Sequence, residues 1–250
     1  MTRTLLVGAL SLVLMPLPQA VAQQDTTGRF TLLFILTPKP GMAKQLEEGF
    51  KRHHAWHTKA ADTRSVGVAV GIFGDDLGKY RVTYSNQSFA GMDAAAPLAA
   101  GDGDDVQLNL APFIEKSESR ILNRNDNLSR VAWNTPASTM NAVTYYYLNP
   151  GQGPEFVGYL QRLKEAHEKA NSPYRYFVLV QILGADSPLY IIVRPLDKFA
   201  DNTPPMHRQV LVAAYGETEA DRLLDVQDNA VRRITSFIAQ NRRDLGYSPR

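Results

Sequence analysis

The fold of this 250-residue chain is decided by residues 30–41, which read FTLLFILTPKPG. An apolar run of strand-forming residues ends in a Pro/Gly turn, and this pattern predicts a strand that leads into a helix. The pattern returns 112 positions later in residues 142–153, AVTYYYLNPGQG. A recurrence of this kind indicates two copies of one structural unit.

Two further blocks recur in the same order along the chain. Residues 68–82 match 178–192 at a spacing of 110, and residues 119–128 match 236–245 at a spacing of 117. Three ordered matches with nearly constant spacing favour a tandem duplication. We therefore predict a first repeat over residues 23–135 and a second over residues 136–250.

The elements within each repeat follow from hydrophobic period and length. Apolar residues at helical spacing predict a helix after each first strand, and Gly-bounded runs rich in Val and Ile predict a hairpin. Further along, we expect a second helix at 106–122 and at 217–243, a flexible loop over the Ala-, Gly- and Asp-rich residues 94–105, and a closing strand at 129–134. The second repeat has only residues 245–250, LGYSPR, at the matching place, where a short edge strand that tolerates Pro249 stays open.

The order β-α-β-β-α-β is that of the ferredoxin-like unit. Both parities of the first strands are apolar, with Leu32 and Phe34 on one face and Leu33 and Ile35 on the other. Both faces of such a sheet must be covered. We predict an α+β fold in which two tandem ferredoxin-like repeats close a pseudo-dimeric eight-stranded barrel with helices outside.

In these features the chain resembles the dimeric α+β barrel superfamily. The resemblance lies in the strand–Pro-x-x-Gly–helix segments at 38–41 and 150–153, and in the Gly74 and Gly184 hairpins that precede Tyr80 and Tyr190. It points to proteins such as antibiotic-biosynthesis monooxygenases, haem-degrading enzymes, chlorite-dismutase-like haem proteins and NIPSNAP-type proteins. No subfamily's catalytic set matches, so the resemblance assigns no catalytic residue.

Residues 1–22 are typical of a signal peptide. Arg3 precedes an apolar run, and Ala20 and Ala22 supply the small residues that signal peptidase requires. An apolar helix of thirteen residues at about 1.5 Å each is too short for a bilayer core of about 30 Å. We therefore expect a periplasmic or secreted protein without a membrane span after cleavage.

Composition excludes several classes of protein. The 27 Lys and Arg residues against 25 Asp and Glu residues give a net charge of +2, too small to predict nucleic-acid binding. The absence of cysteine excludes disulfides, Cys nucleophiles and Cys-based metal sites. A monomer and a homo-oligomer both remain open.

The expected strands carry aromatic residues and one arginine, which are residue types typical of a pocket that binds a planar ligand. Ala69 and Gly71 leave room that Leu179 and Gln181 fill in the second repeat, which suggests one site in the chain. The candidate ligand-binding residues are Tyr84, Trp133, Tyr145, Tyr147 and Arg194.

Histidines provide a second candidate site. His53 and His57 share one helix face at i, i+4, a spacing that zinc and haem sites use, and His167 follows in the second repeat. The sequence shows no third ligand for the pair, so helix packing is the favoured interpretation and no cofactor is predicted. Haem or metal ligation by these three histidines stays as an alternative.

The leading hypothesis for function is an exported barrel that binds a small aromatic or apolar molecule and acts as a cofactor-independent, monooxygenase-like enzyme. Two alternatives remain open. One is a non-enzymatic structural or interaction protein of the cell envelope, and the other is a His-ligated haem or metal protein.

Overall fold

The computed structural model describes residues 28–131, 138–184, 186–203 and 206–249, and the side chains of 96–99 are not described. The expected signal peptide, Trp133 and the last residues of the expected strand 129–134 lie outside these ranges. Within them, no helix is long and apolar enough to cross a membrane.

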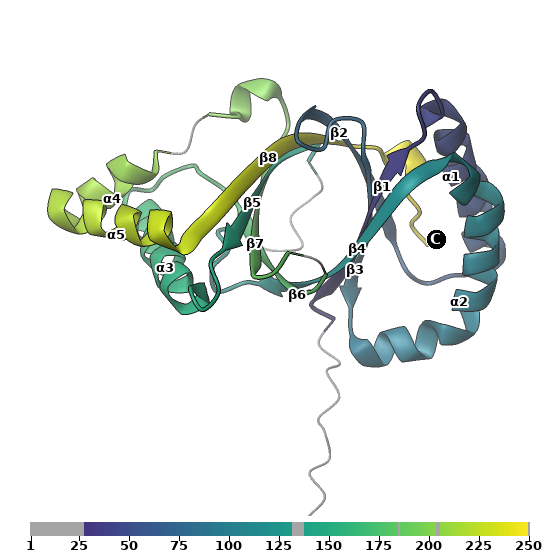
Figure 1. Ribbon diagram of the computed structural model, residues 1–250, viewed down its shortest axis with the longest axis horizontal. Coiled ribbons are helices and arrows are strands. Elements are labelled where there is room, and N and C mark those ends of the chain that lie inside the picture. Colours follow the sequence, from purple (N-terminus) through teal and green to yellow (C-terminus); the bar gives the residue numbers. More distant parts are fainter. Residues whose placement is uncertain (1–27, 132–137, 185, 204–205, 250) are drawn as a thin grey trace, which may run out of the picture.

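The two halves of the chain repeat one order of elements, except that two helices in the second half correspond to one helix in the first (Figure 1). The first half contains β1 (Phe30–Pro38), α1 (Ala43–Lys59), β2 (Val66–Gly74), β3 (Tyr80–Gln87), α2 (Phe89–Asn109) and β4 (Ile114–Asn125). The second half contains β5 (Met140–Leu148), α3 (Gly153–Lys169), β6 (Phe177–Leu183), β7 (Leu189–Leu196), α4 (His207–Tyr215), α5 (Glu217–Ala230) and β8 (Val231–Asn241). The helices α4 and α5 correspond to α2 of the first half. Both first helices and both hairpins lie where the sequence predicts them.

The strands form a closed antiparallel barrel in the order β1-β3-β2-β8-β5-β7-β6-β4. The halves are joined reciprocally, because β4 of the first half pairs with β6 of the second and β8 pairs with β2. The predicted α+β barrel is therefore confirmed. Full closure leaves no sheet edge exposed along these strands.

Helices cover the barrel on two opposite sides, with α1 and α2 on one side and α3, α4 and α5 on the other (Figure 1). Leu33 and Ile35 of β1 belong to the core inside the barrel, whereas Leu32 and Leu36 pack in the core on the α1 side. A third core lies under the helices of the second half. Apolar side chains on both parities of β1 are thus explained by burial of both faces.

Several expected boundaries are wrong. Residues 114–122 are strand and not helix, and the expected helix 217–243 ends at Ala230, where β8 begins. The two strands concerned, β4 and β8, carry runs of exposed charged or polar residues, so their sequences do not alternate between apolar and polar residues. Pairing with neighbouring strands gives them their strand conformation. The closing strands are β4 and β8. The described part of 129–134 is not strand.

The expected loop 94–105 lies within helix α2. The Ser88 side chain caps this helix by accepting a hydrogen bond from the Gly91 N–H at 3.0 Å. Close contact with α1 also stabilises α2. Gly49 of α1 lies so near the end of α2 that a Cβ atom on it would be 2.1 Å from the Asn109 carbonyl oxygen. Tertiary packing therefore outweighs the low helix propensity of Gly101 and Gly103.

Candidate functional sites

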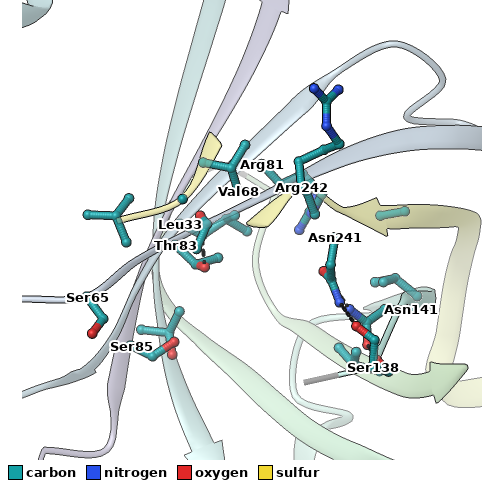
Figure 2. Close-up of a pocket in the computed structure, with 18 of the residues that line it drawn as sticks. Leu33, Ser65, Val68, Arg81, Thr83, Ser85, Ser138, Asn141, Asn241 and Arg242 are labelled. Carbon is teal, nitrogen blue, oxygen red and sulfur yellow. Dashed lines mark hydrogen bonds between the residues drawn. The ribbon is translucent and has the colours of Figure 1, made fainter. Parts of the chain in front are cut away.

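A cavity of about 710 Å³ extends from the inside of the barrel to β2 and the C-terminal residues Gly246 and Tyr247 (Figure 2). Ala69 is among the lining residues, as expected from its small size, but Leu179 lines the cavity too. Most of the wall is aliphatic. Its apolar residues include Leu33, Val68, Leu122, Val143, Leu179, Ile191, Val193 and Ala239.

Polar side chains from two strands meet on one part of this wall (Figure 2). Asn141 Nδ2 donates to Asn241 Oδ1 at 3.2 Å, and Asn241 Nδ2 donates to the Ser138 carbonyl oxygen at 2.8 Å. Ser138 Oγ in turn donates to Asn141 Oδ1 at 3.2 Å. The network gives the cavity an oriented hydrogen-bonding corner.

Arg81 places a buried cation in the cavity wall. Its side chain is 9% exposed and forms an ion pair with Asp76 at 2.8 Å. It also donates a hydrogen bond to the Tyr145 hydroxyl, and its guanidinium lies 4.7 Å from the Phe237 ring centroid. Aromatic and aliphatic surroundings lower the local dielectric, so the Arg81–Asp76 attraction is stronger here than it would be in water.

The predicted ligand-binding residues separate into two groups. Tyr145 and Tyr147 are buried in the core inside the barrel. Tyr84 belongs to the core between the barrel and the helices of the first half, and Arg194 hydrogen-bonds Asn202 and the Asp201 carbonyl. The structure does not bring the two groups together in one pocket.

Tyr84 and Arg194 take part in related cation–π contacts. Arg64 lies over the Tyr84 ring at 5.3 Å, and Arg194 lies over the Tyr174 ring at 4.5 Å. The partners stand 110 positions apart, with Arg64 replaced by Tyr174 and Tyr84 by Arg194. Each half therefore has a cation–π contact at this position, with the cation and the aromatic ring exchanged between the two partners.

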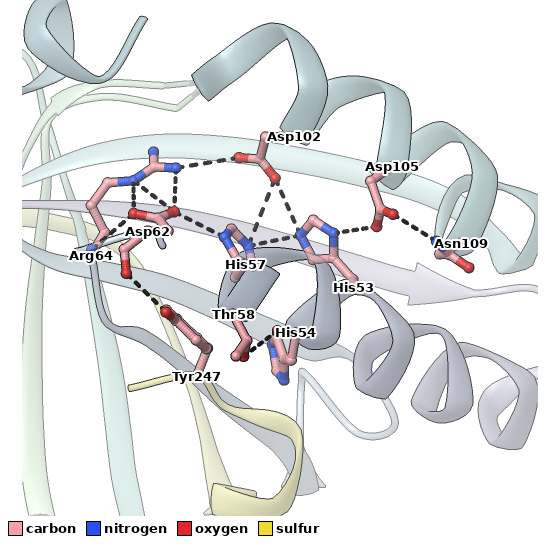
Figure 3. Close-up of polar contacts among 10 residues, drawn as sticks. All are labelled: His53, His54, His57, Thr58, Asp62, Arg64, Asp102, Asp105, Asn109 and Tyr247. Carbon is pink, nitrogen blue, oxygen red and sulfur yellow. Dashed lines mark hydrogen bonds and ion pairs between the residues drawn. The ribbon is translucent and has the colours of Figure 1, made fainter. Parts of the chain in front are cut away.

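The histidine pair lies under α2, outside the barrel (Figure 3). His53 and His57 point from α1 to the same place, with their Nε2 atoms 3.1 Å apart. Asp102 of α2 adds a carboxylate oxygen, whose Oδ1 lies 3.3 Å from His53 Nε2 and 3.7 Å from His57 Nε2. Among the described residues, these three side chains form a group that could hold a metal ion.

Each histidine is oriented by a second carboxylate. His53 Nδ1 lies 2.8 Å from Asp105 Oδ2, and His57 Nδ1 lies 2.9 Å from Asp62 Oδ2. Arg64 binds Asp62 through its Nε and one terminal nitrogen. Burial raises the pKa of Asp62, but the Arg64 hydrogen bonds outweigh it and lower that pKa overall, so the carboxylate is ionised.

Burial, followed by repulsion from His53, lowers the pKa of His57. Burial disfavours the charged form of Tyr84 as well, and together with the negative charge of Asp102 it raises the pKa of the Tyr84 hydroxyl. His57 and Tyr84 are thus held neutral at neutral pH. Asp62 and Arg64 carry opposite charges and pair at 2.7 Å.

His167 is not part of this group. Its Nδ1 lies 3.0 Å from Ser172 Oγ, and its ring stacks on Tyr174 beneath the helices of the second half. The sequence therefore identified the histidine pair but not its carboxylates. Asp102, Asp105 and Asn109 have the i, i+3, i+7 spacing that places side chains on one face of a helix. This spacing has no meaning in a loop, and a loop is what the sequence predicted for residues 94–105.

No family model and no curated protein sequence matches the chain. Solved structures do. A candidate monooxygenase from Lactobacillus acidophilus NCFM superposes with a TM-score of 0.52 at 9% identity, over 88% of this chain and 96% of that chain. An anthrone oxidase-like protein superposes with a TM-score of 0.53 at 11% identity, over 85% of this chain and 91% of that chain. The chain therefore has the dimeric α+β barrel fold of these monooxygenase-like proteins, with both halves of the barrel in one chain.

Proposed function

We propose that the barrel cavity binds a small aromatic or otherwise apolar molecule that carries one oxygen able to bear negative charge. The observation that carries the proposal is the cavity of about 710 Å³ with an aliphatic wall and the buried Arg81. Its size lies in the range of about 300–1,000 Å³ typical of small-molecule sites. Arg81 and the Asn141–Asn241 corner supply the few polar groups that orient such a ligand.

The proposal is tested by calorimetric titration with 2-naphthol and with naphthalene, which lacks the oxygen. Wild-type protein should bind 2-naphthol more tightly. Ala69 corresponds to Leu179, 110 positions later in the second half. Ala69→Leu places this larger side chain in the cavity. It should weaken 2-naphthol binding about tenfold or more, because the added volume overfills the site.

Two further variants make the test specific. Val70→Leu changes the neighbouring residue, which packs on the opposite face of β2, and should leave affinity unchanged. Arg81→Met should abolish the preference for 2-naphthol, while Lys79 still pairs Asp76 at 2.9 Å. Absence of binding to wild-type protein, or equal binding by Ala69→Leu, would overturn the proposal and favour a structural role.

A monooxygenase-like activity is the second candidate, supported by the fold similarity and by the position of Arg81 in the wall. A substrate with an activated methylene can supply all the electrons, because CH₂ + O₂ gives C=O + H₂O. Arg81 would stabilise the enolate oxygen of such a substrate. With anthrone as the probe, O₂ uptake matched by carbonyl formation supports oxygenation, and uptake equal to the buffer rate restricts the protein to binding.

We also infer from the sequence that the protein is exported. The support is the charge, apolar run and small-residue site within residues 1–22. Expression of the full chain followed by mass spectrometry of the exported protein should show an N-terminus at Gln23. An intact N-terminus in the cytoplasm would contradict export.

A further inference from the structure

Three unshared electron pairs converge beneath α2. Because Asp105 and Asp62 accept hydrogen bonds from the Nδ1 atoms of His53 and His57, each ring keeps its proton on Nδ1 and directs a lone pair from Nε2. The two Nε2 atoms face each other at 3.1 Å, and Asp102 Oδ1 completes the triangle (Figure 3). Such a triangle is stabilised by a positive charge between its atoms, which a metal ion or a shared proton can supply.

The spacing of the triangle is that of ligands around one metal ion. Ligand bonds of about 2.0–2.2 Å place neighbouring donor atoms about 2.9 Å apart in octahedral geometry and about 3.4 Å apart in tetrahedral geometry. The distances between the donor atoms are 3.1, 3.3 and 3.7 Å. Small side-chain adjustments would therefore bring all three to one ion.

The formal charge of the carboxylates around the pair also favours a bound cation. Three carboxylates, Asp62, Asp102 and Asp105, surround the histidine pair and Arg64 pairs with two of them, so the formal charge of these four side chains is −2. The side chains of the two histidines are at most 5% exposed and that of Asp102 is 17% exposed, so water screens this charge poorly. One divalent cation neutralises it.

We propose that His53 Nε2, His57 Nε2 and Asp102 Oδ1 bind one divalent first-row transition-metal ion. Two imidazoles and one carboxylate suit Zn²⁺ or Fe²⁺, whereas Ca²⁺ and Mg²⁺ prefer oxygen ligands. Asp62 and Asp105 are the carboxylates that orient the imidazoles, an arrangement found around metal-bound histidines. Three protein ligands leave coordination positions for water or a small molecule.

The second half shows that the fold does not require this cluster. Leu163 stands 110 positions after His53, and Ser172 stands 110 positions after Asp62. The second half nevertheless packs its helices over a complete apolar core. His53 and Asp62 are therefore particular to the first half, whereas His57 keeps a histidine counterpart in His167.

This site is separate from the proposed ligand cavity, but the two share Tyr247 as a wall. Tyr247 lines the cavity, its ring stacks on His57 at 5.3 Å, and its hydroxyl donates to the Asp62 carbonyl at 2.8 Å. Metal binding does not depend on the identity of the cavity ligand. The two proposals can fail independently.

Equilibrium dialysis of chelator-treated protein against Zn²⁺ tests the site, with Co²⁺ as a spectroscopic probe. Wild-type protein should bind one Zn²⁺ per chain, gain thermal stability, and show visible Co²⁺ absorption. Asp102→Asn and His57→Gln remove direct ligands, so each should lower Zn²⁺ affinity by more than the roughly 10–100-fold that loss of an orienting partner costs. Unfolding midpoints without metal show whether each variant is folded, and His53→Gln provides a third ligand variant.

Matched controls are available in the chain. Asp104→Asn changes an exposed carboxylate two residues from Asp102, and His167→Asn changes the counterpart of His57 in the second half. Both should bind Zn²⁺ as tightly as wild-type protein. The proposal is overturned if wild-type protein binds neither Zn²⁺ nor Co²⁺, or if the ligand variants bind as well as the controls; a proton shared by the pair in histidine NMR would then explain the 3.1 Å contact.

Discussion

His57 and His167 occupy equivalent positions in the two halves, 110 residues apart near the ends of α1 and α3. The turn that follows is the same in both halves: the amide of Asp62 or Ser172 donates to the histidine carbonyl, and Ala61 and Asn171 both have positive φ. The side chain that contacts Nδ1 differs, because it is a carboxylate in the first half and a hydroxyl in the second. One backbone motif thus supports two different electrostatic environments.

The carboxylate at position 62 should tune metal affinity. Asp62→Asn keeps the size of the side chain but weakens the hold on His57 Nδ1, and loss of an orienting partner typically costs 10–100-fold in metal affinity. We expect a decrease of about that size in Zn²⁺ affinity, measured by competition with a chelating dye. Ser172→Ala, the matched change in the second half, should have no effect. An unchanged affinity in Asp62→Asn would show that Asp62 serves only Arg64.

His167 should make the protein sensitive to acid. Burial, followed by the charge of Arg130, lowers the pKa of His167 to about 4, below the value of about 6.5 in an unfolded chain. The unfolded state therefore binds the proton first as pH falls. The contribution to stability is complete above about pH 6.5, is lost progressively down to about pH 4, and amounts to up to about 3 kcal/mol.

Denaturant unfolding at several pH values between 4 and 7 checks this expectation. His167→Asn cannot titrate, so its free energy of unfolding should fall less steeply across that window. Ser172→Ala removes the partner of Nδ1 but keeps the buried imidazole, so it should be less stable at every pH with the steep slope retained. Parallel slopes for wild-type protein and His167→Asn would refute the assignment.

The sequence predicts the elements whose hydrophobic pattern is strong. The β1 and β5 segments, their helices and the two hairpins follow from period and turn residues, and burial on both faces predicts the barrel. β4 could not be predicted in this way, because Glu115, Lys116 and Ser117 are exposed and hide its period. Its strand conformation comes from pairing with β1 and β6, which are distant in sequence.

The candidate metal cluster was half predictable for a related reason. His53 and His57 share a face through local spacing alone. Asp102 and Asp105 join them only because α2 continues through Gly101 and Gly103, and that continuity depends on contact with α1. A site formed by two packed helices requires both helices to be recognised first.

The contact between α1 and α2 gives a prediction on stability. A Cβ at Gly49 would lie 2.1 Å from the Asn109 carbonyl oxygen, so Gly49→Ala must push the helices apart. We expect a loss of about 2 kcal/mol or more in the free energy of unfolding, together with weaker Zn²⁺ binding. Gly158→Ala on α3 meets no atom within 4 Å and should stabilise the protein by up to about 1 kcal/mol through helix propensity. Urea unfolding of both variants decides between close packing and ordinary helix preference.

The buried ion pair in the cavity wall should respond unequally to removal of its two partners. Asp76→Ala leaves the Arg81 guanidinium, 9% exposed, without a carboxylate, and we expect a loss of about 3 kcal/mol or more in the free energy of unfolding. Arg81→Met should cost less, because Lys79 Nζ still lies 2.9 Å from Asp76. The double variant removes both buried charges, so it should be more stable than the sum of the single losses implies. A double-mutant cycle in urea measures this coupling, and strict additivity would show that Tyr145 and water, rather than Asp76, stabilise the Arg81 charge.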